Sequence, residues 1–189
     1  MSKLRSWLFG GIKALLAVSF ALAFSAHAQQ PLKIGFGMSL TGPLAGNGKA
    51  ALIGMQIWAE DVNAKGGILG RKVELVYYDD QTNPSTVPSI YNKLLDVDKV
   101  DLVVSGYGTN VIAPAMPIMM QRNMVFMSLF GLNVNSKFSY DRYFQIMPAG
   151  PEPAVGWSQG FFDIAAGLSP KPTTVALVGA DAEYPALAL

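Results

Sequence analysis

The sequence of 189 residues contains no cysteine, and its single histidine, His27, lies near the N-terminus. Without cysteine the chain cannot form a disulfide or a zinc site of the cysteine–histidine kind. Removal of the first 28 residues would leave no histidine, which excludes a Ser-His-Asp triad and a Cys-His dyad within the chain. Charged residues make up only 14% of the sequence and hydrophobic residues 51%. These absences restrict the kinds of site that the chain itself can form, and the high hydrophobic content is typical of a chain with buried parallel strands.

The N-terminus has the pattern of a secretory signal peptide. Lys3 and Arg5 precede an uncharged apolar run over residues 14–24, and the small residues of "AHA" form a cleavage site that ends at Ala28. The run is shorter than the about 20 apolar residues that a transmembrane helix needs, although an uncleaved anchor is the alternative. We therefore expect a signal peptide over residues 1–28, cleavage after Ala28 and a periplasmic mature protein.

Removal of the signal peptide changes the charge balance. Three of the 14 basic residues (Lys3, Arg5 and Lys13) lie in it, so 11 basic residues face 13 acidic ones and the net charge is −2. Nucleic-acid binding requires clustered positive charge. We therefore expect no nucleic-acid partner.

The rest of the chain alternates between strand and helix patterns. Apolar runs predict strands at residues 32–39, 72–80, 100–106, 124–131, 143–147 and 173–181. Helical spacing, caps and C-terminal glycines predict helices at residues 50–67, from 84, at 110–122, at 154–168 and from 183. Pro114 and Pro117 should lie in the first turns of their helix or bend it. This alternation predicts right-handed βαβ units in parallel α/β sheets.

The stretch "SLTGPLAGNGKAALIGMQ" is close to a phosphate-binding loop but fails in two respects. The spacing from Gly42 to Gly48 is one residue too long, and Ala50 stands where a hydroxyl would hold the magnesium ion. The glycine fingerprint of dinucleotide folds also fails, at Leu40. We therefore expect no nucleotide and no other cofactor, and a turn whose following helix N-terminus faces a binding cleft.

In open parallel sheets, ligands bind beyond the carboxyl ends of the strands. That rule selects the loops at residues 40–48, 80–83, 106–110 and 130–133. Thr109 or Asn110 could simply cap a helix, or the Thr109 hydroxyl and nearby main-chain N–H groups could hold a carboxylate, and the two roles are compatible. Asp79 and Asp80 could be a metal or acid/base pair, but a solvated strand end and turn is the favoured interpretation.

Together these residues resemble the type I periplasmic binding proteins of ABC importers, specifically the Leu/Ile/Val-binding family. The resemblance covers most of residues 31–189 and is clearest in "NAKGGILGRKVEL" and "KPTTVALVGADAEY". It implies an α/β fold of two doubly wound lobes with parallel sheets. Lobe 1 would occupy residues 29–147 and lobe 2 would begin in residues 148–189, so that the chain corresponds to about half of the family's length.

The resemblance also implies a function without catalysis. Such a protein captures a small carboxylate-bearing ligand between its lobes, either an amino acid or an aromatic or aliphatic carboxylate, and delivers it to a membrane permease. A ligand-sensing receptor of the same fold and, less favoured, an α/β enzyme are the alternatives. The implied ligand-binding residues are Asn47 as part of a lid, Tyr107, Gly108, Thr109 and Asn110 as a carboxylate loop, Phe130, Gly131 and Leu132 as a second clamp, and Tyr184 from lobe 2.

Leu132 departs from the family pattern. A leucine side chain cannot accept a hydrogen bond from a ligand ammonium group, and an unpaired buried ammonium would be costly. The ligand therefore need not be an α-amino acid. The alternative is that main-chain carbonyls and an acidic residue from lobe 2 supply the missing partners.

Overall fold

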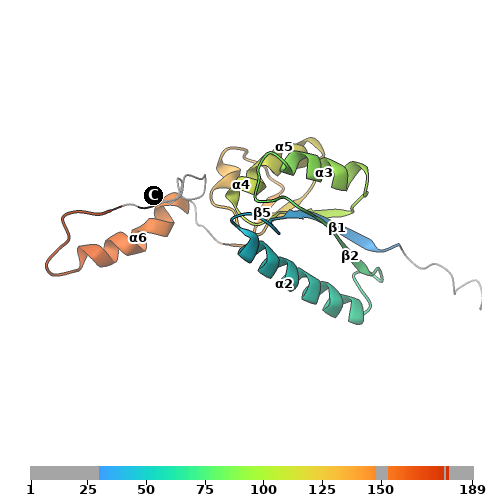
Figure 1. The fold of residues 1–189 in the computed structure, drawn as a ribbon, viewed down its shortest axis with the longest axis horizontal. Coiled ribbons are helices and arrows are strands. Elements are labelled where there is room, and N and C mark those ends of the chain that lie inside the picture. Colours follow the sequence, from blue (N-terminus) through green and yellow to red (C-terminus); the bar gives the residue numbers. More distant parts are fainter. Residues whose placement is uncertain (1–29, 148–152, 177, 179–189) are drawn as a thin grey trace, which may run out of the picture. The chain divides into compact units, whose positions relative to one another are not determined.

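The computed structural model describes residues 30–147, 153–176 and 178. Residues 30–147 form a layered α/β body in which helices cover a central sheet (Figure 1). The predicted signal peptide and Tyr184 lie outside the described residues, and the division of the chain into lobes stays a prediction.

The sheet has five strands, all parallel, in the order β2-β1-β3-β4-β5. Their bounds are β1 (Leu32–Met38), β2 (Val73–Asp79), β3 (Leu102–Val104), β4 (Phe126–Ser128) and β5 (Tyr143–Gln145). Each strand lies within a predicted segment. β1 pairs with β2 on one side and with β3 on the other. The chain therefore continues from β1 to β2 in one direction across the sheet, and from β2 it crosses back over β1 to form β3. The carboxyl ends of β1 and β3 therefore flank a topological switch point, which is where open α/β sheets bind ligands.

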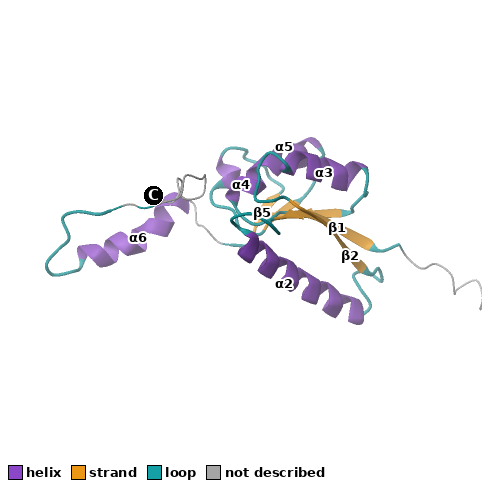
Figure 2. Cartoon of the chain, in the orientation of Figure 1, coloured by secondary structure: helices purple, strands orange, loops and turns teal. Residues whose placement is uncertain are grey.

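Helices cover the two faces of the sheet unequally, as Figures 1 and 2 show. On one side lies α2 (Ala45–Ala64) alone, and on the other lie α3 (Val87–Asp96), α4 (Thr109–Ile112) and α5 (Met116–Gln121). The 3-10 turns η1 (Ala113–Ala115) and η2 (Val134–Ser136) complete the body. The predicted single helix over residues 110–122 is broken at η1, which contains Pro114, so the expected proline bend is confirmed.

The α2 helix begins earlier than its apolar pattern predicts. Residues 45–48, which the sequence places in a loop, already belong to the helix. The turn before it is closed by Gly42, whose φ is +82° and whose carbonyl accepts a hydrogen bond from Ala45 N at 3.1 Å. Gly48 is buried against the loop after β1, and a Cβ atom there would lie 2.0 Å from Ser39 O. The glycine that imitates a phosphate loop therefore serves close packing between helix and loop.

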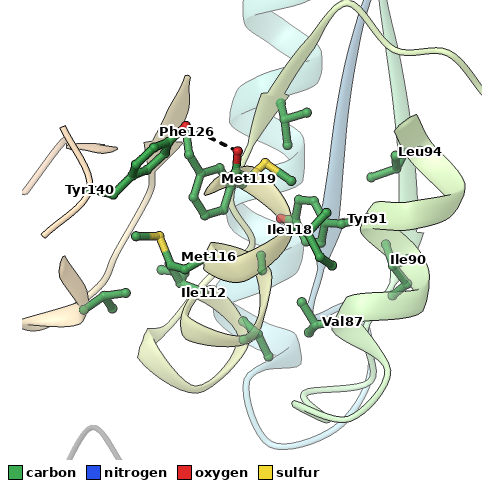
Figure 3. Close-up of a cluster of buried hydrophobic side chains, with 14 of the residues drawn as sticks. Val87, Ile90, Tyr91, Leu94, Ile112, Met116, Ile118, Met119, Phe126 and Tyr140 are labelled. Atoms are coloured by element: carbon green, nitrogen blue, oxygen red, sulfur yellow. Dashed lines mark hydrogen bonds between the residues drawn. The ribbon is translucent and has the colours of Figure 1, made fainter. Parts of the chain in front are cut away.

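The main core lies between the sheet and the α3–α5 side (Figure 3). Tyr91 meets Phe126 edge to face, with ring centroids 5.8 Å apart. The Tyr140 hydroxyl donates to main-chain carbonyls of Met124 at 2.6 Å and Met119 at 3.3 Å, so the polar end of this buried ring is satisfied. A smaller cluster under α2 is formed by Ile34, Ala59 and Val73.

The segment after residue 152 contains α6 (Pro153–Ala166), as predicted. The strand expected over residues 173–181 is not observed in its described part, because residues 173–176 and 178 have no regular structure. A strand requires a hydrogen-bonded neighbour, and residues 153–176 provide none. The apolar β-branched pattern of "TTVALV" alone could not reveal this.

Candidate functional site

Three of the predicted site residues meet at the carboxyl edge of the sheet. The rings of Tyr107, after β3, and Phe130, after β4, stack with centroids 5.2 Å apart and planes 9° apart. Asn47, in the first turns of α2, donates from Nδ2 to the Tyr107 hydroxyl at 3.0 Å. Asn47 is exposed and both rings are half-buried. This cluster, which we call the aromatic platform, joins three segments far apart in sequence on an accessible surface.

The glycine at position 108 connects the platform to the helix that follows. Its φ of +104° lies in the left-handed region that favours glycine. Its N–H donates to Phe130 O at 3.1 Å, and its carbonyl accepts hydrogen bonds from Val111 and Ile112 at 3.1 Å. Gly108 therefore fixes the direction of the chain between the aromatic platform and α4.

Thr109 is 1% exposed, and its hydroxyl accepts a hydrogen bond from Leu132 N at 2.9 Å. The hydroxyl thus ties the loop after β3 to the loop after β4. Leu132 is also fully buried, at 0% exposure, and Gly131 beside it is buried too. The side chain of Leu132 therefore packs inside the body and does not form a wall of the exposed site, which the sequence could not indicate.

Main-chain donors remain next to the platform. Within the described part of the chain, no hydrogen bond is formed by the N–H groups of Thr109 or Asn110 at the start of α4. Neither a cap nor another loop uses them, since no side-chain cap bond occurs at this end of the helix. N–H groups at such a position attract negative charge.

Asp79 organises the neighbouring loop. Its carboxylate accepts hydrogen bonds from the main-chain N–H groups of Leu40, Thr41 and Gln81 at 2.9–3.1 Å and from Thr41 Oγ1 at 2.7 Å. Partial burial raises the pKa of Asp79, but these hydrogen bonds outweigh it, and the pKa lies below its ordinary value. The carboxylate therefore stays ionised and holds the loop after β1 in place.

Asp80 differs from its neighbour, and the interpretation as a solvated turn residue is wrong for it. Asp80 is 1% exposed, and its Oδ1 accepts from Ser39 Oγ at 2.7 Å and from Thr82 N at 2.8 Å. Its Oδ2 has no hydrogen-bond partner among the residues that the structure describes. Burial and the nearby charge of Asp79 raise the pKa of Asp80 against the hydrogen bonds from Ser39 and Thr82, which lower it. The sequence does not predict the hydrogen bond between Ser39 and Asp80. Both residues follow the end of a strand, where the alternation of buried and exposed side chains no longer applies.

Neither a metal centre nor a membrane span is found in the described residues. No group of three His, Cys, Asp or Glu residues is placed to hold a metal ion in residues 30–147 or 153–176. Among the helices of the same ranges, none has the length and apolar character needed to cross a bilayer.

The sequence is similar to curated amino-acid-binding proteins. It is 39% identical over 105 residues to an amino acid binding protein of Pseudomonas aeruginosa, a match that covers 56% of this chain and 28% of the relative. It is 36% identical over 107 residues to the Leu/Ile/Val-binding protein of Escherichia coli K12, covering 56% of this chain and 29% of the relative. The matched segment thus spans less than a third of each relative.

Solved structures show the same fold. The substrate binding protein LivJ of a branched-chain amino acid transporter from Streptococcus pneumoniae, in complex with isoleucine, matches with a TM-score of 0.57 at 27% identity, over 61% of this chain and 33% of LivJ. A putative branched-chain amino acid ABC transporter protein from Silicibacter pomeroyi matches with a TM-score of 0.61 at 27% identity, over 71% of this chain and 34% of that one.

A family model settles the classification. The model described as "Periplasmic binding protein" matches residues 31–188, which is nearly all of the chain after the predicted signal peptide. The relatives above are binding proteins and not enzymes, in agreement with the prediction of a non-catalytic protein. The parallel α/β sheet agrees with the predicted fold of lobe 1. The chain belongs to the periplasmic binding protein family.

Proposed function

We propose that this chain contains the first lobe of an extracytoplasmic solute receptor, which captures a small carboxylate-bearing ligand and delivers it to an ABC importer permease. The observation that carries the proposal is the aromatic platform beside the N–H groups of Thr109 and Asn110 at the switch point of the sheet. Apolar rings suit the hydrocarbon part of a ligand, and unpaired N–H groups suit its carboxylate.

The relatives support an amino acid as the first ligand to test. The similar proteins are an amino acid binding protein, a Leu/Ile/Val-binding protein and a structure containing isoleucine. An aromatic or aliphatic carboxylate without an ammonium group would use the same donors and rings. The hydroxyl of Tyr107 accepts its hydrogen bond from Asn47, so its own proton is available for the ligand. The remaining contacts, including one from Tyr184, would come from the second lobe.

Binding to the full-length protein tests this proposal. Titration calorimetry with leucine, isoleucine, valine and benzoate should show at least one ligand with a dissociation constant in the micromolar range or tighter. A ligand at 100 times its dissociation constant should also stabilise the protein by about 2.7 kcal/mol. Absence of binding by all four, together with no small molecule released on denaturation of the freshly purified protein, would contradict the proposal.

A pair of matched variants places the site. Tyr107→Leu removes the ring and hydroxyl of the platform, and should weaken binding about tenfold or more, since an aromatic contact and a hydrogen bond together contribute about 1–3 kcal/mol. Tyr77→Leu is the control, because Tyr77 also stacks in parallel, on Phe36 at 5.4 Å, and also accepts an amide hydrogen bond, from Gln56. Equal loss of affinity in both variants would mean that the platform is not the binding site.

Export to the periplasm is part of the proposal. The predicted signal peptide, cleaved after Ala28, would take the protein to the compartment in which importers collect their ligands. N-terminal sequencing of the protein from the periplasmic fraction should begin at Gln29. A cytoplasmic protein with Met1 retained would contradict this part of the proposal without affecting ligand binding.

A further inference from the structure

The outer side of α2 carries an exposed apolar row. The inward residues Gly48 and Ala59 are buried against the rest of the body. Ile53 and Ile57 lie on the opposite side of the helix, and each is 56% exposed. Within residues 30–147, α2 is the outermost layer on its side of the sheet (Figure 1). Two large apolar side chains one turn apart on an outer helix face indicate a contact surface.

The spacing of this row is that of a coiled-coil seam. Its positions are separated alternately by four and three residues, which is the a/d pattern of packed helices. The row, which we call the α2 seam, consists of the exposed residues Gly46, Ala50, Ile53, Ile57, Glu60 and Ala64. A Cβ atom added to Gly46 would meet nothing within 4 Å. Small residues toward the ends of the seam allow a second helix to approach closely, and the isoleucines fill its centre.

The α2 seam is complementary to a second copy of itself that runs antiparallel. Its six positions are arranged symmetrically about position 55. With a two-fold axis at that point, Ile53 of one copy would pack on Ile57 of the other, and Gly46 would lie opposite Ala64. The axis repeats each of these contacts, as an isologous dimer interface requires.

Charge complementarity favours the antiparallel orientation. Lys49 and Glu60 lie on the same flank of α2, because 11 residues make about three helical turns. Within the part of the chain that the structure describes, neither side chain forms a hydrogen bond or an ion pair. In the antiparallel pair each lysine faces a glutamate of the other copy, at two symmetric places. A parallel pair would instead bring like charges together.

We propose that the α2 seam is a self-association surface, through which two copies of this protein pair antiparallel. Ile53 packs on Ile57 at the centre, and Lys49 pairs with Glu60 at both sides. The seam is about 27 Å long at a rise of 1.5 Å per residue. One helix on each side buries less than the about 1,200 Å² of a stable complex, so the dimer is weak and reversible.

The pairing leaves the aromatic platform accessible. Asn47 donates to Tyr107 and so marks the flank of α2 that is turned toward the platform. That flank lies about a quarter of a turn from the α2 seam. Self-association is therefore independent of the ligand and goes beyond the proposed receptor function.

Sedimentation equilibrium of the full-length protein tests the pairing. At about 1 mM protein at least half of the molecules should be dimers, and dilution should return them to monomers. Ile57→Ser should lower the association constant at least tenfold, because the two-fold axis removes the apolar contact twice. Val97→Ser is the matched control, because Val97 is 68% exposed at the end of α3, on the other side of the sheet. This control should associate like the unchanged protein.

Charge reversal tests the orientation. Lys49→Glu and Glu60→Lys should each weaken the dimer at least about threefold at low salt, because like charges then meet at both sides. The double variant exchanges the two charges and should restore the association constant to within about twofold. Ligand affinity should be unchanged in all three variants. Urea midpoints at low protein concentration verify that each variant is folded, and the charge variants decide the outcome if Ile57→Ser is not.

Several outcomes would overturn the proposal. A monomer at about 1 mM would mean that the α2 seam contacts something other than a second copy. A dimer that is equally stable in folded Ile57→Ser, or in both charge reversals, would form through another surface. Failure of the double variant to restore the dimer would exclude the antiparallel arrangement. Weakening in the single variants, restoration in the double variant and no change in Val97→Ser support the proposal.

Discussion

Replacement of Gly48 by alanine tests whether the start of α2 is held against the loop after β1. Gly48 is buried in the second turn of the helix, and a Cβ atom on it would lie 2.0 Å from the main-chain oxygen of Ser39. Ordinary contacts to a Cβ atom begin at 3.4 Å. The helix or the loop must therefore move by about 1.4 Å, the difference between these two distances, and neither side of the contact is a flexible side chain.

The expected change in the stability of Gly48→Ala follows from two opposed effects. Overpacking of this kind costs about 1–3 kcal/mol, and sometimes more when the backbone must shift. Alanine also favours the helix over glycine by up to about 1 kcal/mol. Gly46 isolates the second effect, because it lies one residue inside the same helix and a Cβ atom there meets nothing within 4 Å. Because the helix preference acts in both variants, it cancels in their difference, and Gly48→Ala should be less stable than Gly46→Ala by the overpacking cost of about 1–3 kcal/mol.

Urea denaturation of the two variants measures this difference. With a slope of about 2 kcal/mol per molar urea, the midpoints should differ by about 0.5–1.5 M. A shift of α2 would also move Asn47 away from Tyr107, whose hydrogen bond is 3.0 Å long, so ligand affinity should fall in Gly48→Ala alone. If both variants unfold at the same urea concentration, α2 is not packed against Ser39 as described, and the explanation for this glycine is refuted.

Two further substitutions test the polar contacts beneath the site. Thr109→Val removes the acceptor for Leu132 N and should lower the free energy of unfolding by about 1–3 kcal/mol, with faster hydrogen exchange at the Leu132 amide. Thr109→Ser keeps the hydroxyl and is the control. Equal exchange at the Leu132 amide in both variants would exclude the hydrogen bond. Asp80 has a raised pKa, so the folded state binds its proton more tightly than the unfolded state. The contribution of Asp80 to the stability of the fold should therefore be largest at a pH below its ordinary pKa of 3.8, and should be lost as the pH rises through its raised pKa. Asp80→Asn should remove this decline in urea titrations at several pH values, and an unchanged pH profile would mean that Asp80 ionises normally.

The order of strands and helices in residues 30–147 could be predicted from the sequence because it depends on local pattern. Within residues 30–147 each predicted apolar run contains a strand, and Pro114 broke its helix as expected, since both effects depend on neighbouring residues. The loops that meet at the carboxyl edge could also be predicted, because parallel strands joined by helices present their carboxyl ends together. Asn47, Tyr107 and Phe130 do meet there.

What each side chain does at that edge was decided by the tertiary structure. The sequence cannot distinguish a solvated Asp-Asp pair from the arrangement found here, in which Asp80 is buried and Asp79 holds a loop. Leu132 is fully buried beside the distant Thr109, whose hydroxyl accepts from its N–H, and Gly48 matters only because Ser39 approaches it in space. Local pattern fixes the period of a strand or helix, whereas burial depends on which segments pack on it. For the same reason, the exposure of Leu102, Met127 and Phe144 on β3, β4 and β5 became visible only once the strands were placed side by side.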